Sequence, residues 1–167
     1  MNYVQTNCIL TADVIKRKLR RMTFEIAERN TGATDIILAG IAGNGTVVAQ
    51  HIWQELKAII SADIPLITVH INKKQPLEVR VDSDIHFDNK IIILADDVAN
   101  SGRTMLYALK PFLDFKPKSI QTLILVERSH KLFPVQSDYV GLSIATTLQE
   151  HIAVETEGDT ITGAWLH

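Results

Sequence analysis

The chain has 167 residues, of which 46% are hydrophobic and 22% charged, with a net charge of −2. Such values are ordinary for a globular protein with its own core, and they give no global attraction to nucleic acid. The one cysteine, Cys8, excludes an intrachain disulfide, and the apolar runs are too short to cross a bilayer, so we expect a cytoplasmic protein with no membrane contact. Since no repeat or linker divides the sequence, residues 1–167 are expected to form a single domain.

The first half of the chain alternates between helical and strand patterns. Residues 11–32 place apolar residues at helical spacing between a threonine cap and an Asn-Thr-Gly stop, which predicts a helix. Residues 35–41 are typical of a strand that is buried on both faces, and residues 45–60 return to a helical stripe. In residues 66–82, two β-branched runs flank Asn-Lys-Lys-Gln-Pro, and this pattern predicts a hairpin that forms a flap.

The second half continues the alternation with strands at 90–95 and 119–127, separated by a helix at 101–114. Three shorter strands are expected afterwards, at 139–141, 152–155 and 160–165. The last two could pair about Gly158. Strands that alternate with helices predict an α/β fold, in which a mostly parallel central sheet is flanked by helices and ligands bind at the carboxyl ends of the strands.

Two adjacent acids, Asp96 and Asp97, directly follow the strand predicted at 90–95. Ionised carboxylates without partners are costly to bury, so this pair indicates a binding role. The acids can accept hydrogen bonds from ribose hydroxyls, or bind Mg²⁺, which favours one or two carboxylates together with substrate oxygens. One acid could simply cap the next helix, but a cap leaves the second unexplained. We therefore predict both as catalytic and metal-binding residues.

The loop after the acids joins a strand end to a helix start, where it can bind a phosphate. The first N–H groups of a helix have no intrahelical partners, and the helix dipole is positive at that end. A glycine lets the backbone approach the ligand, and hydroxyl groups add donors. The residues expected to hold the phosphate are Ala99, Asn100, Ser101, Gly102, Arg103 and Thr104. Diol acceptors followed by a phosphate loop describe a site for a ribose 5-phosphate.

A second glycine-containing loop, Gly40 to Thr46, lies between the strand at 35–41 and the helix at 45–60. It approaches the P-loop pattern, but Thr46 stands where the lysine is required, which argues against an NTPase. The loop could form a backbone nest for a second anionic group. It could equally be a turn whose glycines permit tight packing of strand on helix, and the sequence alone favours neither.

Beyond these local features, residues 92–104 resemble the PRPP (phosphoribosyl pyrophosphate) signature of type I phosphoribosyltransferases: apolar residues, two acids, a short loop and Ser-Gly-x-Thr. Within that group, residues 126–146 are similar to the bifunctional pyrimidine operon regulator/uracil phosphoribosyltransferase family. The matching positions are Val126, Arg128, His130, Pro134, Asp138, Tyr139, Gly141, Ile144 and Thr146. The resemblance implies the type I phosphoribosyltransferase fold with a small flap or hood, and a homodimer or higher homo-oligomer.

The resemblance also implies a Mg²⁺-dependent transfer of phosphoribose from PRPP to a nucleobase, with uracil as the favoured acceptor and UMP and pyrophosphate as products. Asp96 and Asp97 would hold the ribose diol, and residues 100–104 the 5-phosphate. Glu127 and Arg128 would lie beside the base. The pyrophosphate would lie on the backbone amides of Ala42, Gly43, Asn44 and Gly45. Such enzymes depend on positioning, electrostatics and exclusion of water.

The sequence departs from this family in the pyrophosphate loop, because residues 42–45 include no cation. We therefore expect weaker PRPP binding, or a reliance on Mg²⁺ and on the flap, where Lys73, Lys74 or Arg80 would supply the charge. On the sequence alone, Asn44→Arg is expected to raise the affinity for PRPP in a calorimetric titration. An unchanged affinity would count against this placement of the pyrophosphate.

A second departure concerns nucleic acid. Gln136, Leu142 and Leu148 stand where the family's RNA-binding face has cations, which argues against RNA binding. A cluster of cations at 17–21 remains, but such a run is usually the wet face of a helix. The alternative function is regulatory: a protein that senses PRPP or UMP and has little or no catalytic turnover. Binding of RNA could be part of that regulation. Transfer to a purine is a third option, and only residues 126–146 argue against it.

Overall fold

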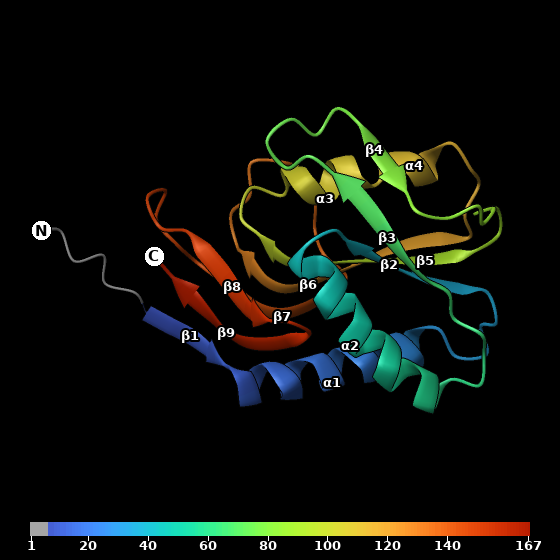
Figure 1. Cartoon of the computed structure of the whole chain (residues 1–167), viewed down its shortest axis with the longest axis horizontal. Coiled ribbons are helices and arrows are strands. Elements are labelled where there is room, and N and C mark those ends of the chain that lie inside the picture. Colours follow the sequence, from blue (N-terminus) through green and yellow to red (C-terminus); the bar gives the residue numbers. More distant parts are fainter. Residues whose placement is uncertain (1–6) are drawn as a thin grey trace, which may run out of the picture.

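The computed structural model describes residues 7–167, so residues 1–6 of the expected domain lie outside the described part. Six strands form a central sheet in the order β4-β3-β2-β5-β6-β7, and three form a second sheet in the order β1-β9-β8 (Figure 1). The strands are β1 (Asn7–Thr11), β2 (Ile36–Ile41), β3 (Leu66–Ile71), β4 (Val79–Val81), β5 (Ile91–Ala99), β6 (Ser119–Arg128), β7 (Tyr139–Ile144), β8 (Ile152–Glu157) and β9 (Thr160–Leu166). The helices are α1 (Ala12–Arg29), α2 (Asn44–Ile59), α3 (Arg103–Ala108) and α4 (Lys110–Leu113).

The central sheet is parallel except for its edge strand β4, which confirms the predicted α/β class. Every residue of β2 is buried, because the two faces of the sheet are covered by different helices. Ile36 and Leu38 pack into a cluster with α1 and α2, whereas Ile37 packs into a cluster with α3 and α4 on the opposite face. Figure 1 shows these two helix pairs on opposite sides of the sheet.

Two boundaries differ from the predictions. β5 runs to Ala99 rather than ending at residue 95, so the two acids lie within a strand that is paired with β6, and Asp96 stands opposite Ile124. The helix predicted over 101–114 was wrong as one element, because it divides into α3 and α4 at Leu109. Pro111 lies in the first turn of α4 and has no N–H to donate to the preceding turn, which explains the break.

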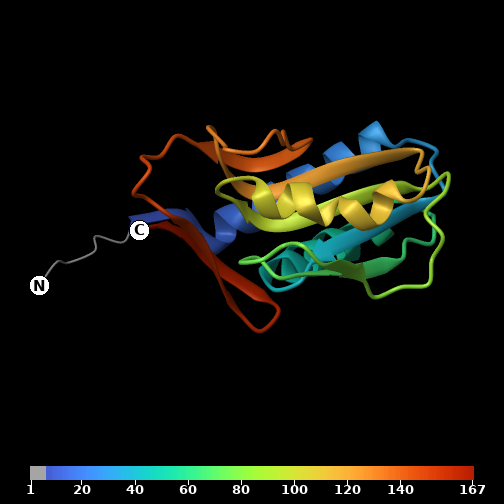
Figure 2. The ribbon, with the colours of Figure 1, turned by 90° about the horizontal axis from the view of Figure 1, so that it is seen from above.

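The second sheet, which we call the hood, stands at the carboxyl-end side of the central sheet (Figure 2). The predicted pairing of β8 with β9 is confirmed, with Gly158 at φ 59° in the connecting turn. β1 was not predicted. It pairs antiparallel with β9, at the far end of the sequence, so its local residues alone give little sign of it.

The cations of α1 are not simply a wet face. Lys18 Nζ donates to Gly141 O at 2.9 Å, and Arg21 Nη2 donates to Val140 O at 2.8 Å. Both acceptors are backbone carbonyls of β7, the strand at the open edge of the central sheet. These two cations therefore cover an exposed strand edge. Over residues 7–167, no helix has both the length and the hydropathy needed to cross a membrane.

Candidate functional site

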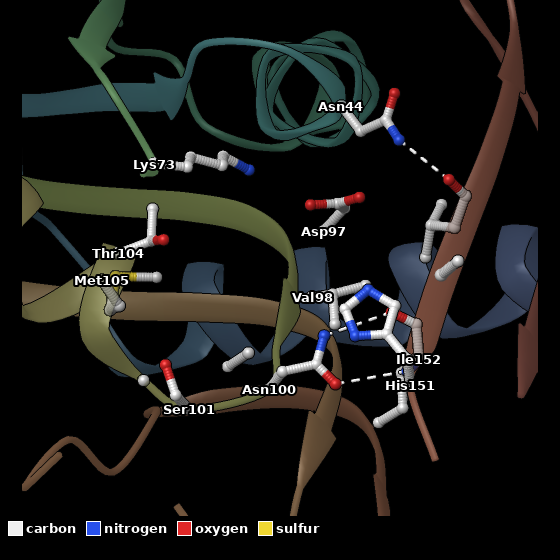
Figure 3. A pocket seen from close by; sticks show the side chains of 14 residues that line it. Asn44, Lys73, Asp97, Val98, Asn100, Ser101, Thr104, Met105, His151 and Ile152 are labelled. Atoms are coloured by element: carbon white, nitrogen blue, oxygen red, sulfur yellow. Dashed lines mark hydrogen bonds between the residues drawn. The ribbon is translucent and has the colours of Figure 1, made fainter. Parts of the chain in front are cut away.

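Both loops that the sequence singled out meet at one cavity of about 380 Å³ (Figure 3). Five parts of the chain line it: the first turn of α2, the flap, the end of β5 with the loop that follows, the first turn of α3, and the start of β8. The predicted site residues on its lining are Asn44, Asp97, Ala99, Asn100, Ser101, Gly102 and Thr104. The other predicted residues do not line this cavity: Ala42, Gly43, Gly45, Asp96, Arg103, Glu127 and Arg128.

The two acids occupy different environments. Asp97 points into the cavity, whereas the side chain of Asp96 is 1% exposed and lies behind the lining. Asp96 Oδ1 accepts a hydrogen bond from the backbone N of Asp97 at 2.9 Å, and Lys73 Nζ of the flap lies 3.7 Å from Asp96 Oδ2. Burial raises the pKa of Asp96 well above its usual range, and the neighbouring Asp97 adds to this, while Lys73 opposes it. The site thus contains a carboxylate that is short of positive charge.

The pyrophosphate loop shows one of the two roles that the sequence left open, the tight packing of strand on helix, and its role as an anion nest stays a prediction. A Cβ on Gly45 would lie 2.7 Å from Asp96 Oδ1, so this glycine permits close packing of α2 on β5. Gly43 has a φ of 97°, and nothing would lie within 4 Å of a Cβ there. The amide of Ala42 donates to Val69 O at 2.8 Å and is already used. The amide of Thr46 donates to Gly43 O at 3.1 Å, so the amides of Asn44 and Gly45 at the start of α2 are the donors that this loop can offer an anion.

The side chain of Asn44 turns away from this anion position and bonds to the hood. Asn44 Nδ2 donates to Val154 O at 2.8 Å, and Asn44 Oδ1 accepts from Thr156 Oγ1 at 3.0 Å. Both partners belong to β8. An arginine at position 44 would lose both hydrogen bonds, so the structure gives a reason to expect a looser hood instead of tighter PRPP binding from Asn44→Arg.

Asn100 makes a matching connection from the phosphate loop. Its Nδ2 donates to Ile152 O and its Oδ1 accepts from Ile152 N, both at 3.2 Å, as a paired strand would. Figure 3 shows this two-point contact together with the contact from Asn44 to β8. The hood is therefore hydrogen-bonded to both ligand loops through side-chain amides.

The phosphate loop is shaped by Gly102, which has a φ of 83°, in the left-handed region that favours glycine. Ser101 O accepts from the backbone N of both Leu132 and Phe133 at 3.1 Å, so the β6–β7 connection supports the loop from behind. Arg103 does not line the cavity: its Nη2 donates to the backbone O of Lys73 at 3.0 Å. This arginine fastens the flap to the start of α3.

Glu127 and Arg128 do not line the cavity of Asp97. Glu127 Oε2 is 3.0 Å from Lys131 Nζ, and their side chains are 11% and 9% exposed. Arg128 Nη2 donates to Glu150 O at 2.5 Å and to Asn100 Oδ1 at 3.4 Å, and the residue lines a second cavity of about 400 Å³. These contacts hold the backbone around the site, so the position beside the base that the sequence suggested for both residues stays a prediction.

The hood contributes residues to the site that the sequence did not predict. His151, Ile152, Ala153 and Val154 line the cavity opposite β5, but nothing in their local sequence marks them as ligand-binding residues. Among residues 7–167, no three His, Cys, Asp or Glu side chains gather around a common point. A metal at the acids would therefore need oxygen atoms from a substrate as further ligands, which is the way Mg²⁺ usually binds.

The sequence is similar to known phosphoribosyltransferases over most of its length. A family model described as the phosphoribosyl transferase domain matches residues 5–157. The chain is 38% identical over 152 residues to the bifunctional protein PyrR of Ligilactobacillus salivarius, covering 84% of this chain and 85% of the relative. It is 35% identical over 158 residues to the PyrR protein of Enterococcus faecalis, covering 89% of each.

Solved structures show the same fold at low sequence identity. A hypoxanthine phosphoribosyltransferase of Trypanosoma cruzi superimposes with a TM-score of 0.75 at 14% identity, covering 94% of this chain and 90% of the other. A hypoxanthine phosphoribosyltransferase of Staphylococcus aureus gives a TM-score of 0.71 at 14% identity, covering 87% and 79%. At such identities the similarity shows the fold and does not indicate which nucleobase this chain uses.

The buried acid makes a prediction about stability. The raised pKa of Asp96 means that the folded chain holds this proton more tightly than the unfolded chain, where the pKa is about 3.9. Stability should therefore decrease as the pH rises from about 4 through the raised pKa. Asp96→Asn keeps the Oδ1 acceptor and cannot ionise, so its Tm should exceed that of the wild type at neutral pH. The difference should shrink toward about pH 4 when melting is followed in a metal chelator. A difference independent of pH would contradict the prediction.

The amide connections to the hood make a second prediction. Asn100→Ala leaves the N–H and C=O of Ile152 without their partner, and it should lower the free energy of unfolding by about 1–3 kcal/mol. Hydrogen exchange at the Ile152 amide should become faster, while amides of β2 keep their protection. Gln149→Ala, which removes an exposed amide from the neighbouring loop, serves as the control. Unchanged exchange at Ile152 would show that Asn100 does not hold the hood.

Proposed function

The chain belongs to the phosphoribosyltransferase family and, within it, to the group of the bifunctional PyrR proteins, and from this membership we propose that it transfers phosphoribose from PRPP to uracil. The observation that carries the proposal is that Asp97 of the acidic pair, the phosphate loop and the first turn of α2 converge at one cavity. In the proposed reaction, a bond forms between C1 of the ribose and N1 of uracil. The bond from C1 to the pyrophosphate oxygen breaks and its electron pair leaves with pyrophosphate, while the N1 proton passes to solvent.

Different residues of the cavity bind different parts of PRPP. The carboxylate of Asp97 accepts hydrogen bonds from the ribose hydroxyls, and residues 100–104 hold the 5-phosphate through backbone amides and the hydroxyl of Thr104. The amides at the start of α2 receive the pyrophosphate. Fixing both ends of PRPP holds C1 in place for the base, and such positioning accounts for a large part of the catalysis in transfers of this kind.

Mg²⁺ fits the chemistry of the acidic pair. Asp97 faces the cavity, and the buried Asp96 behind it lacks compensating charge. These two carboxylates would hold the ion, with substrate oxygens completing its ligands. When bound, Mg²⁺ supplies positive charge that stabilises the leaving pyrophosphate. The homodimer or higher homo-oligomer that the resemblance implies stays a prediction.

The base is proposed to lie toward the hood. Val98 and Ile152 give the cavity apolar walls suited to a planar ring, and His151 stands beside them with a polar edge. Uracil is favoured because the PyrR relatives and the match over residues 126–146 both indicate a pyrimidine. Glu127 and Arg128 are proposed to support this part of the site, through Lys131 and Asn100, without touching the base.

A second function is favoured by one observation. Residues 42–45 carry no charge, and the Asn44 side chain is committed to β8, so the pyrophosphate loop offers only backbone donors. A protein with such a loop can bind PRPP or UMP as a regulatory sensor with little turnover. RNA contact is not favoured, because Lys18 and Arg21 are already bonded to the edge of β7.

The experiment that tests the proposal measures pyrophosphate release from PRPP with Mg²⁺, across uracil, hypoxanthine, guanine, adenine and orotate. Release with uracil alone is expected. Asp97→Asn removes a charged acceptor at the ribose and should lower kcat/KM by about 10²-fold or more.

Release with hypoxanthine or guanine in place of uracil would overturn the choice of base. If no base supports pyrophosphate release while PRPP or UMP still raises the Tm, the result would favour a sensor over an enzyme.

A further inference from the structure

The flap carries one residue, Lys73, that reaches into the proposed substrate site. It lies in the connection between β3 and β4 and lines the cavity of Asp97 and the phosphate loop. Figure 3 shows its amino group directed toward the middle of this cavity. The side chain of Lys73 is 47% exposed, whereas its partner Asp96 is 1% exposed, at an Nζ–Oδ2 distance of 3.7 Å. The lysine is thus loosely held and can change partner.

The backbone of Lys73 is held more firmly than its side chain. Its carbonyl accepts from Arg103 Nη2 at 3.0 Å, which ties the flap to the start of α3. Asn72 Oδ1 accepts from the backbone N of Lys74 at 3.0 Å and of Gln75 at 3.3 Å, which fixes the turn on either side of Lys73. The Lys73 ammonium group is therefore presented to the cavity by an ordered turn.

A bound diphosphate would need a cation on the cavity lining to balance its negative charge. Among the described residues that line it, Lys73 is the one lysine, and no arginine accompanies it. The opposing lining includes the carboxylate of Asp97, and the pyrophosphate loop offers backbone amides alone. A diphosphate group bound there would bring several negative charges to a wall that has no side chain to balance them.

The other two flap cations are placed differently. Arg80 lies on β4 opposite His70 and lines a separate cavity of about 390 Å³ with Ala42 and Glu78. Lys74 is exposed and does not line the cavity of Asp97. Of the three flap cations, Lys73 is therefore the one that lines the cavity of Asp97. The sequence alone could not distinguish it from Lys74 and Arg80.

The geometry points to Lys73 as a substrate-contacting residue that binds the diphosphate group of PRPP, in exchange for its contact with Asp96. Lys73 acts through its charge and transfers no proton. It balances the charge on the diphosphate in the complex and on pyrophosphate as it leaves. This inference rests on the proposed function, because it requires PRPP to occupy the cavity.

The test compares PRPP with ribose 5-phosphate, which lacks the diphosphate group, by calorimetric titration in the presence of Mg²⁺. Lys73→Gln removes one charge-assisted contact and should weaken PRPP binding about 10- to 100-fold. The affinity for ribose 5-phosphate should stay within about 3-fold of the wild type or increase, since that ligand has no group for Lys73 to hold.

Two further variants separate a specific contact from general disturbance. Lys74→Gln removes the adjacent exposed charge and should leave both affinities unchanged. Lys73→Arg keeps the charge and should restore most of the affinity for PRPP, while the Tm of each variant reports on folding.

Each contrary result has a distinct meaning. Equal losses for PRPP and ribose 5-phosphate in Lys73→Gln would overturn the inference, because Lys73 would then act on the flap as a whole. Unchanged PRPP affinity in Lys73→Gln would overturn it as well, and leave the proposed function intact. A wild-type protein that binds neither ligand would overturn the proposed function together with this inference.

Discussion

The close approach of the first turn of α2 to β5 is the constraint on which the site depends. A side chain on Gly45 would collide with Asp96 and with the carbonyl of Ala95, so only glycine lets these elements pack at this distance. The packing brings the free amides of α2 next to the acidic pair, and it also seals Asp96 from water. Tight packing and a desolvated carboxylate are thus two results of one contact.

The hood completes the site by bonding to both loops at once. Asn44 and Asn100 begin on different loops of the central domain, yet both end on β8 through pairs of hydrogen bonds. Side-chain amides suit this purpose because each provides a donor and an acceptor, as a backbone peptide does. The position of β8 relative to the phosphate loop is consequently fixed by polar contacts. The apolar wall from Ile152 is presented at the same time.

The charged groups at the site fall into two sets, one behind the phosphate loop and one on the lining of the cavity. Glu127 and Lys131 form a nearly buried pair behind the phosphate loop, where a Cβ on Gly102 would lie 3.4 Å from Lys131 Cδ. Their charges satisfy each other, and breaking such a pair would leave one buried charge without a partner. Lys73 and Asp97, in contrast, are open to the cavity. A ligand in the cavity would therefore meet Lys73 and Asp97, while the pair of Glu127 and Lys131 supports the loop.

The sequence by itself determined the alternation of strands and helices, the acidic pair, the phosphate loop and the family. Each of these is a local pattern, set by periodicity or by a short run of residue types around Asp97 and Gly102. The tertiary structure decided that the acids lie within β5 rather than beyond it, because pairing with β6 extends the strand. It also decided the contacts of Asn100 with a residue 52 positions away and of Asn44 with one 110 positions away. Such contacts depend on the order of strands in space, so no local pattern can encode which atoms Asn44, Asn100 and Lys73 reach.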